Sequence, residues 1–312
     1  MGGKHYDDAR TPRAAYLAAE ARIKQQAQDH FGLVSIPKHL GDKADYGDLD
    51  LLVIKSELTP ERLQAFGASL RQGAEDVKHQ KNHDMESYRA PLSAHEVELA
   101  RQSGAAEIPT HLQVDLFPCE DELDMRKRLE FMNWGDFSAI LGKMLIPLNL
   151  QWSTRGLEYI YRFKHIKRLI PVSELSLALH IAELDADRYQ SGFSTEGEMF
   201  AFIMESPLLD HQQWIKPGSK AEKHGSKRPS MGRFIEMLKA RHAEQNEQNQ
   251  QVQHPDLPFD ELLEKISCFE DPGKTLIKEA RRGEQIASEL REEVKSLDHK
   301  YAMIQALSEE FR

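Results

Sequence analysis

Apolar and polar residues alternate along two segments of the chain in a way that predicts β-strands. Residues 48–54 read Asp-Leu-Asp-Leu-Leu-Val-Ile, and residues 111–117 read His-Leu-Gln-Val-Asp-Leu-Phe. Leucine and β-branched residues without a breaker favour strands, and the period of two puts successive side chains on opposite faces. We therefore expect both segments in a sheet, with a further strand near residues 86–90.

Apolar residues at helical spacing predict the helices. Before residue 135 these are expected over residues 11–28, 59–73 and 95–102. After Asp136 the pattern becomes mostly helical, and one strand-like segment over residues 156–162 interrupts it. The helices expected there cover residues 137–148, 172–186, 195–204 and 231–241. A polar low-complexity stretch, residues 242–254, is expected to be a loop.

The order of these elements predicts an α+β fold. A small mixed sheet with flanking helices comes first, because strand, helix, strand and strand follow one another. A mainly helical domain follows, and a long C-terminal helix ends the chain. We place the boundary near residue 135, so that residues 1–135 form one domain and residues 136–312 the other.

The C-terminal stretch, from about residue 273 to 311, predicts one long charged helix with an apolar seam. The seam repeats at 4-3-4-3 spacing through Leu290, Val294, Leu297, Tyr301 and Ile304. Its regular part covers only about two heptads, which favours an amphipathic helix that packs on its own domain. The alternative is a homo-oligomer formed through this helix.

Composition narrows the function classes. The formal net charge of the 312 residues is -10, which argues against a protein whose whole surface binds nucleic acid, since phosphate neutralisation needs dense Lys and Arg. Two basic clusters leave a local interface open, with solvated faces as the alternative. They are Arg162, Lys164, Lys167 and Arg168, and Lys216, Lys220, Lys223, Lys227, Arg228 and Arg233.

Cysteine content and hydropathy bear on the compartment. The two cysteines, Cys119 and Cys268, can build neither a disulfide framework nor a zinc module of cysteines. The first residues show no apolar signal region, and no apolar run approaches the roughly 20 residues that cross a bilayer. We expect an intracellular, soluble, cytoplasmic protein without a membrane partner.

Three aspartates carry the candidate chemistry. Asp48 and Asp50 share one face of their strand, about 7 Å apart, while Leu49 and Leu51 point to the other face. Two neighbouring carboxylates raise each other's proton affinity, and a cation between them relieves the repulsion. If the two strands are neighbours, Asp115 joins the pair. Such a cluster suits Mg²⁺ (or Mn²⁺), and two ions are expected.

Three short motifs surround these acids: Leu40-Gly-Asp, Gly47-Asp-Leu-Asp-Leu-Leu-Val and Val114-Asp-Leu-Phe. Together they resemble the signature of the polymerase-beta-like nucleotidyltransferase superfamily over roughly residues 30 to 120. The resemblance implies that Asp48, Asp50 and Asp115 are catalytic metal ligands, and that Asp115 also helps to deprotonate the acceptor hydroxyl. It further implies an NTP substrate, magnesium, and transfer of a nucleoside monophosphate to a hydroxyl with release of pyrophosphate.

The loop before Asp48 is the expected phosphate site, because its backbone N–H groups can face a triphosphate. Where the superfamily has Gly-Ser or Gly-Gly, this chain has Gly41-Asp42. An acid facing a triphosphate needs compensation from a metal or from Lys43. The predicted nucleotide-binding residues are Gly41, Asp42, Lys43, Gly47 and, on the first helix of the second domain, Lys143.

By the resemblance, residues 1–135 are a nucleotidyltransferase catalytic domain and residues 136–312 bind substrate. The acceptor implied is an RNA or another nucleic-acid 3′ end, bound through the basic clusters. One alternative is nucleotidylation of a protein or a small molecule. Another is a catalytically silent relative that acts as a binding or assembly module, which Asp42 supports. A third takes the aspartates as solvated acids at strand ends.

Overall fold

The structure is a computed structural model that describes most of the chain up to residue 247. The described residues are 6, 8–71, 77–82, 85–148, 150–163, 166–173, 175–209, 214–216, 223, 225 and 228–247. The C-terminal helix predicted over residues 273–311 lies outside them, as do Lys164, Lys220 and Lys227 of the basic clusters. Among the described helices, none combines the length and the apolar character that a membrane span requires.

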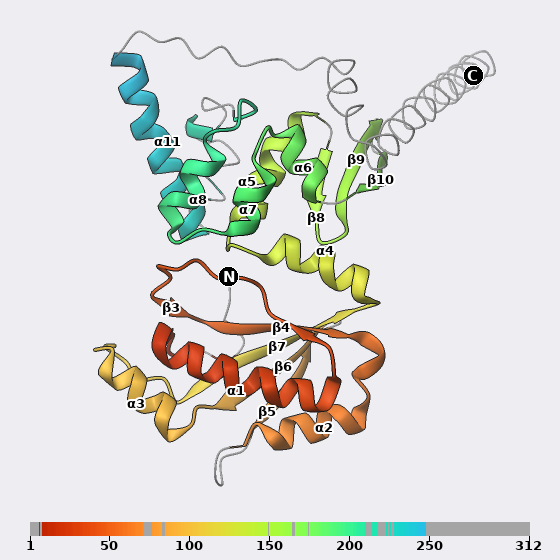
Figure 1. Cartoon of the computed structure of the whole chain (residues 1–312), viewed down its shortest axis with the longest axis vertical. Helices are drawn as coiled ribbons and strands as arrows, with labels where there is room; N and C mark the ends of the chain where they lie inside the picture. The colour runs from red at the N-terminus through yellow and green to blue at the C-terminus, as the bar shows by residue number, and fades with distance from the viewer. Residues whose placement is uncertain are drawn as a thin grey trace, which may run out of the picture.

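A five-stranded mixed sheet organises the first part of the chain (Figure 1). Its strand order is β2-β4-β7-β6-β5, in which β4 and β7 run parallel and the other neighbours antiparallel. The strands are β2 (Val34–Ser35), β4 (Asp48–Ile54), β5 (Lys78–Asn82), β6 (Met85–Pro91) and β7 (His111–Cys119). A separate short pairing joins β1 (Thr11–Pro12) to β3 (Asp45–Tyr46).

Three helices pack on one face of this sheet: α1 (Arg13–Phe31), α2 (Pro60–Ser69) and α3 (Ala94–Gln102). The alternating pattern places Leu49, Leu51 and Val114 in the core between them. Local signals set the start of α2. The Thr59 side chain accepts a hydrogen bond from the Arg62 backbone N–H, and Pro60 is the first residue of the helix. A 3₁₀ turn, η1 (Lys55–Glu57), connects β4 to α2.

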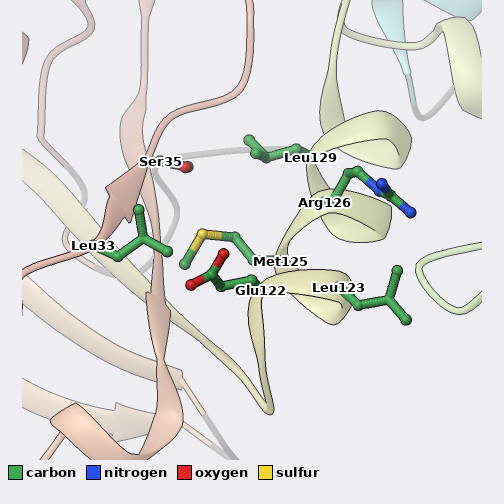
Figure 2. Close-up of a pocket in the computed structure, with 7 residues that line it drawn as sticks. All are labelled: Leu33, Ser35, Glu122, Leu123, Met125, Arg126 and Leu129. Carbon is green, nitrogen blue, oxygen red and sulfur yellow. The ribbon is translucent and has the colours of Figure 1, made fainter.

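Helix α4 (Glu122–Met132) lies on the opposite face, near the carboxyl end of β4 (Figure 1). There Met125 packs with Leu52 and Cys119. The sequence did not predict this helix, because its charged residues hide a narrow apolar side. A groove of about 410 Å³ separates α4 from the edge strand β2 (Figure 2). Its lining contains none of the three aspartates; it consists of Leu33, Ser35, Glu122, Leu123, Met125, Arg126 and Leu129.

The second part of the chain combines helices with a three-stranded antiparallel sheet, β8-β9-β10. The strands are β8 (Leu150–Ser153), β9 (Gly156–Phe163) and β10 (Ile166–Ser173). The helices are α5 (Phe137–Leu145), the 3₁₀ turn η2 (Ile146–Leu148), α6 (Leu175–Ile181), α7 (Ala186–Ser191), α8 (Glu196–Ile203) and α11 (Pro229–Glu247).

Two predictions for this part were wrong in detail. Residues 172–186 do not form one helix, because β10 reaches Ser173 and α6 ends at Ile181. The polar stretch from residue 242 is helical as far as Glu247, since Gln and Glu are good helix formers even without an apolar face. The helices over residues 137–148, 195–204 and 231–241 and the strand over residues 156–162 were predicted.

The α+β class is confirmed, and the described residues form two large hydrophobic cores. One lies between the five-stranded sheet and α1 to α3. The other gathers α5, α6, α8 and α11 with β8, and it includes Leu40 and Trp134 from before residue 135. The domain boundary near residue 135 stays a prediction.

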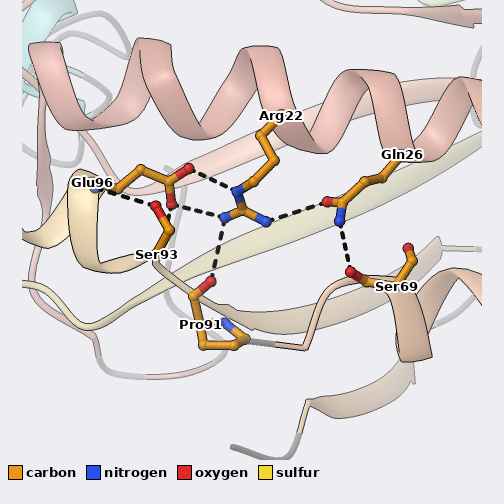
Figure 3. A network of polar contacts seen from close by, with 6 residues as sticks. All are labelled: Arg22, Gln26, Ser69, Pro91, Ser93 and Glu96. Carbon is orange, nitrogen blue, oxygen red and sulfur yellow. Dashed lines mark hydrogen bonds and ion pairs between the residues drawn. The ribbon is translucent and has the colours of Figure 1, made fainter. Parts of the chain in front are cut away.

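A polar network connects α1 to the start of α3 on the same face of the sheet (Figure 3). The Arg22 guanidinium donates to both oxygens of Glu96, at 2.7 and 2.8 Å, and to the Pro91 carbonyl. Glu96 is only 2% exposed, and it also accepts from the Ser93 backbone N–H in a capping box. A buried carboxylate of this kind depends on its cation.

We expect Arg22→Met to destabilise the protein by about 3 kcal/mol, because it leaves the Glu96 charge buried without its partner. Urea unfolding would measure the loss. The matched control is Arg101→Met, which breaks an exposed ion pair with Glu98 on the same helix and should cost no more than about 0.5 kcal/mol. Equal losses in the two variants would contradict this account of the network.

Candidate metal centre

Asp48, Asp50 and Asp115 lie together at the centre of the five-stranded sheet. One carboxylate oxygen from each lies within 4.8 Å of the other two. The parallel pairing of β4 with β7 causes this, because it sets Asp50 directly opposite Asp115 and Asp48 opposite Gln113. The three acids that the sequence singled out are thus brought to one place.

The same face continues across β6, because Ser87 pairs with Asp115 and Arg89 pairs with Gln113. Residues directly opposite each other in a sheet share a face. Two cross-strand rows result, Asp50-Asp115-Ser87 and Asp48-Gln113-Arg89. We call this side of the sheet the acid face; the opposite side carries the apolar core.

Two neighbouring side chains hold Asp115 in a fixed orientation. The Ser87 hydroxyl donates to one carboxylate oxygen at 2.6 Å, and the Gln113 amide donates to the other at 2.7 Å. All three side chains are buried, and Asp115 is 4% exposed. Both bonds stabilise the ionised form of the carboxyl group. The orientation of the Asp115 carboxylate is therefore fixed, as a ligand of a cation requires.

Asp50 carries the electrostatic cost of the cluster. Burial, together with the charges of Asp48 and Asp115, raises its pKa well above the ordinary aspartate value, and Lys43 opposes the shift. A metal ion would remove this penalty by neutralising the acids. Oxygen ligands of one Mg²⁺ lie about 3 to 4 Å apart, so carboxylates gathered as here fit a divalent cation.

The predicted phosphate loop contacts the second part of the chain. Both carboxylate oxygens of Asp42 accept from the Glu196 backbone N–H, each at 3.1 Å, at the start of α8. Negative charge is favourable there because the first turn of a helix has N–H groups without helical partners. The Asp42 carboxylate therefore binds a helix start instead of the expected phosphate position.

Gly41 makes a second close approach in this loop. A Cβ atom at this position would lie 2.5 Å from the Ser194 carbonyl oxygen, so only glycine fits without a backbone shift. Glu196 is itself held by Arg233 of α11, which donates at 2.5 and 2.9 Å and lowers the Glu196 pKa against the effect of burial. The two parts are thus joined by Gly41 against Ser194 and by the series from Asp42 through Glu196 to Arg233.

Lys43 is brought to the acid face. Its Nζ lies 4.2 Å from the centre of the Tyr46 ring, and Tyr46 stacks on Tyr16 with 3.7 Å between ring centroids. Desolvation lowers the Lys43 pKa, whereas the charges of Asp48 and Asp50 act in the opposite direction. Arg13 donates a hydrogen bond to the Tyr46 hydroxyl and so helps to hold the end of the loop that carries Lys43. Gly47 lies between Tyr46 and Asp48.

Lys143 is placed elsewhere. Its Nζ lies over the Trp214 ring, 5.6 Å from the centroid, and burial and Arg228 lower its pKa. None of its described contacts leads to the aspartates, and its role in nucleotide binding stays a prediction. In the second basic cluster, Arg228 pairs with Asp136 and Arg233 with Glu196. These two arginines thus have structural partners within the second part.

Sequence reasoning did not single out four residues of the acid face or its rim: Tyr6, Ser87, Arg89 and Gln113. The alternation in β6 could have indicated Ser87 and Arg89, since Tyr88 and Ala90, which alternate with them, are buried in the core. Gln113 precedes Asp115 by two residues and could have been placed beside it in the same way. No pattern in the sequence points to Tyr6.

No protein-family model matches the sequence, and no curated protein matches it. Among solved structures, the chain is similar to polymerase beta from Leishmania infantum in a ternary P/T complex. The identity is 10% and the TM-score 0.40, over 55% of this chain and 73% of that one.

We expect Asp50→Asn to stabilise the metal-free protein at neutral pH by about 1 kcal/mol, because it relieves the repulsion within the cluster. A carboxyl group whose pKa is raised on folding binds its proton more tightly in the folded state. In EDTA the stability of the native protein relative to this variant should therefore fall as pH rises from about 4. It should then level off above the folded pKa.

Thermal unfolding with Mg²⁺ or Mn²⁺ completes this test. The ions should raise the melting temperature of the native protein and leave that of Asp50→Asn nearly unchanged. Equal stabilisation of both proteins by the metal would rule out this cluster as the metal site.

Proposed function

We propose that the chain is a metal-dependent nucleotidyltransferase that moves a nucleoside monophosphate from an NTP to an acceptor hydroxyl. The observation that carries the proposal is the convergence of Asp48, Asp50 and Asp115 from two parallel strands. Acids brought together at an energetic cost are typical of a site built for a cation. The resemblance of the surrounding motifs to polymerase-beta-like enzymes supplies the reaction class.

The residues take separate roles in the proposed reaction. Asp48, Asp50 and Asp115 would hold Mg²⁺ or Mn²⁺, which supplies charge stabilisation for the phosphates and the leaving group. Asp115, oriented by Ser87 and Gln113, accepts the proton of the acceptor hydroxyl. The acceptor oxygen forms a bond to the α-phosphorus, the bond from that phosphorus to the oxygen leading to the β-phosphate breaks, and pyrophosphate leaves.

The parts of the chain would divide the substrates. We assign catalysis to residues 1–135 and binding of the acceptor to residues 136–312. Lys43, whose charge interacts with those of Asp48 and Asp50, would balance the charge of a triphosphate. An RNA or another nucleic-acid 3′ end is the acceptor we favour; a protein or small-molecule hydroxyl is the alternative, and the salt dependence of binding separates them.

The contacts of Asp42 argue against the alternative that the protein is a catalytically silent nucleotidyltransferase relative. That hypothesis rested on the acid in the phosphate loop, which would repel a triphosphate. The Asp42 carboxylate instead accepts from the start of α8. Its charge is thus directed at a helix N-terminus.

Replacing both Asp48 and Asp50 by Ala should abolish NTP-dependent transfer, lowering it at least about 10³-fold, since the metal ligands are lost. Transfer from labelled NTPs in the presence of Mg²⁺ to a mixed pool of RNA, DNA and protein would measure it. The control is Asp29→Ala, which removes an exposed acid of α1 whose partner is Gln25. It should retain native activity; full activity of the double variant would refute the proposal.

A second prediction separates an Asp42 that repels phosphate from one that positions the loop. Asp42→Ala should weaken Mg·NTP binding about fivefold, because it loses a helix-start contact of about 1 kcal/mol. Asp42→Asn keeps an oxygen acceptor and should bind nearly as well as the native protein. Calorimetry with a non-hydrolysable NTP measures both. Tighter binding by Asp42→Ala would show that the acid acts by repulsion.

A further inference from the structure

The described residues that precede α1 make contacts at β6 and at β3. The Tyr6 hydroxyl donates to the Ser87 carbonyl at 3.1 Å. At the other end, β1 pairs with β3, which directly precedes β4. We call Tyr6 and residues 8–12 the N-terminal arm. Burial and the Asp115 charge raise the pKa of Tyr6, which agrees with a position beside the acids.

Asp8 of the arm occupies the guanidinium group of Arg89. Nε of Arg89 lies 3.0 and 2.9 Å from the two carboxylate oxygens, and one Nη lies 2.6 Å from the first. Two nitrogen atoms of Arg89 thus donate to the Asp8 carboxylate in the bidentate geometry that guanidinium groups also use to bind phosphate. The side chains are 25% and 18% exposed, so the pair is sheltered.

The position of Arg89 distinguishes this pair from an ordinary surface anchor. Arg89 lies on the acid face, in the row that continues through Gln113 to Asp48, about 10 Å from Asp48 between Cα atoms. Lys78 of β5 pairs with Arg89 from the other side, so two cations stand next to each other there. A second ion pair of the arm, Arg10 with Asp45, is 51% and 50% exposed.

We propose that Arg89, with Lys78 beside it, is a subsite for a phosphate group of a substrate, and that Asp8 fills this subsite in the free protein. The inference deepens the proposed function, since the subsite lies on the acid face next to the reacting groups. A substrate phosphate replaces the Asp8 carboxylate on the Arg89 fork and releases that end of the arm.

Pyrophosphate binding to the full chain in EDTA at low salt tests the subsite without metal or catalysis. Asp8→Asn removes the competing charge while it keeps the size of the side chain, and it should bind pyrophosphate about tenfold more tightly than the native protein. The double variant Asp8→Asn with Arg89→Gln should lose that gain. Asp8→Asn with Arg89→Lys keeps the charge without the fork and should be intermediate.

Arg10→Gln is the matched control, because it loosens the arm at its exposed ion pair without freeing Arg89. Its pyrophosphate affinity should stay within about twofold of the native value. Circular dichroism and melting temperature verify that each variant is folded. Native-like affinity of Asp8→Asn, or equal affinity of Asp8→Asn with and without Arg89→Gln, would overturn the proposal.

Two further titrations of Asp8→Asn identify the source of the phosphate. With Mg²⁺ and a saturating non-hydrolysable NTP, loss of pyrophosphate binding assigns the subsite to the NTP. Continued binding, together with binding of a 5′-phosphorylated dinucleotide, assigns it to the acceptor. Failure of the proposed function would appear as absent Mg·NTP binding, and it would leave the metal-free comparison of Asp8→Asn with its Arg89 double variant unchanged.

Discussion

The parallel pairing of β4 with β7 is the constraint on which the site depends. It sets Asp50 opposite Asp115 and keeps Asp48 on the same face. Because side chains alternate along a strand, a shift of one residue in either strand would exchange the acids with buried leucines and valines. The apolar core on one face therefore fixes the register that assembles the acids on the other. Strands β4 and β7 thus supply both the core residues on one face and the three acids on the other.

The fold sustains an unfavourable arrangement of charge. Asp50 is ionised only at a cost, as the rise in its pKa shows. Around it, Ser87 and Gln113 hold Asp115 through hydrogen bonds, and Lys43 lies above the Tyr46 ring near the acids. These contacts reduce the repulsion without removing it. The hydrophobic core on the opposite face of the sheet stabilises the fold enough to offset the remaining repulsion among the acids. A bound cation would remove this repulsion.

Local patterns predicted the centre of the site but not its surroundings. Alternation in residues 48–54 and 111–117 was sufficient for both strands and for the shared face of Asp48 and Asp50. It left open whether the strands are neighbours, which depends on pairing across the chain. The contact of Asp42 with Glu196 spans 154 residues, so no local pattern could reveal it. Charge-rich α4 and the strands β8 and β10 were missed because their apolar positions are few or irregular.

The two edges of the acid face contact different segments of the chain: the β4 edge contacts the second part, and the β6 edge contacts the N-terminal arm. On the β4 side, Leu40 belongs to the second core, Gly41 abuts Ser194 and Asp42 binds the start of α8. On the β6 side, the arm binds Arg89 through Asp8. The three carboxylates sit on paired strands of the sheet, whereas Asp42 and Arg89 beside them are held by polar and ionic contacts of their side chains. Under the proposed function, substrate phosphates would compete for contacts of this kind, and binding would rearrange the surroundings while the acids stay in register.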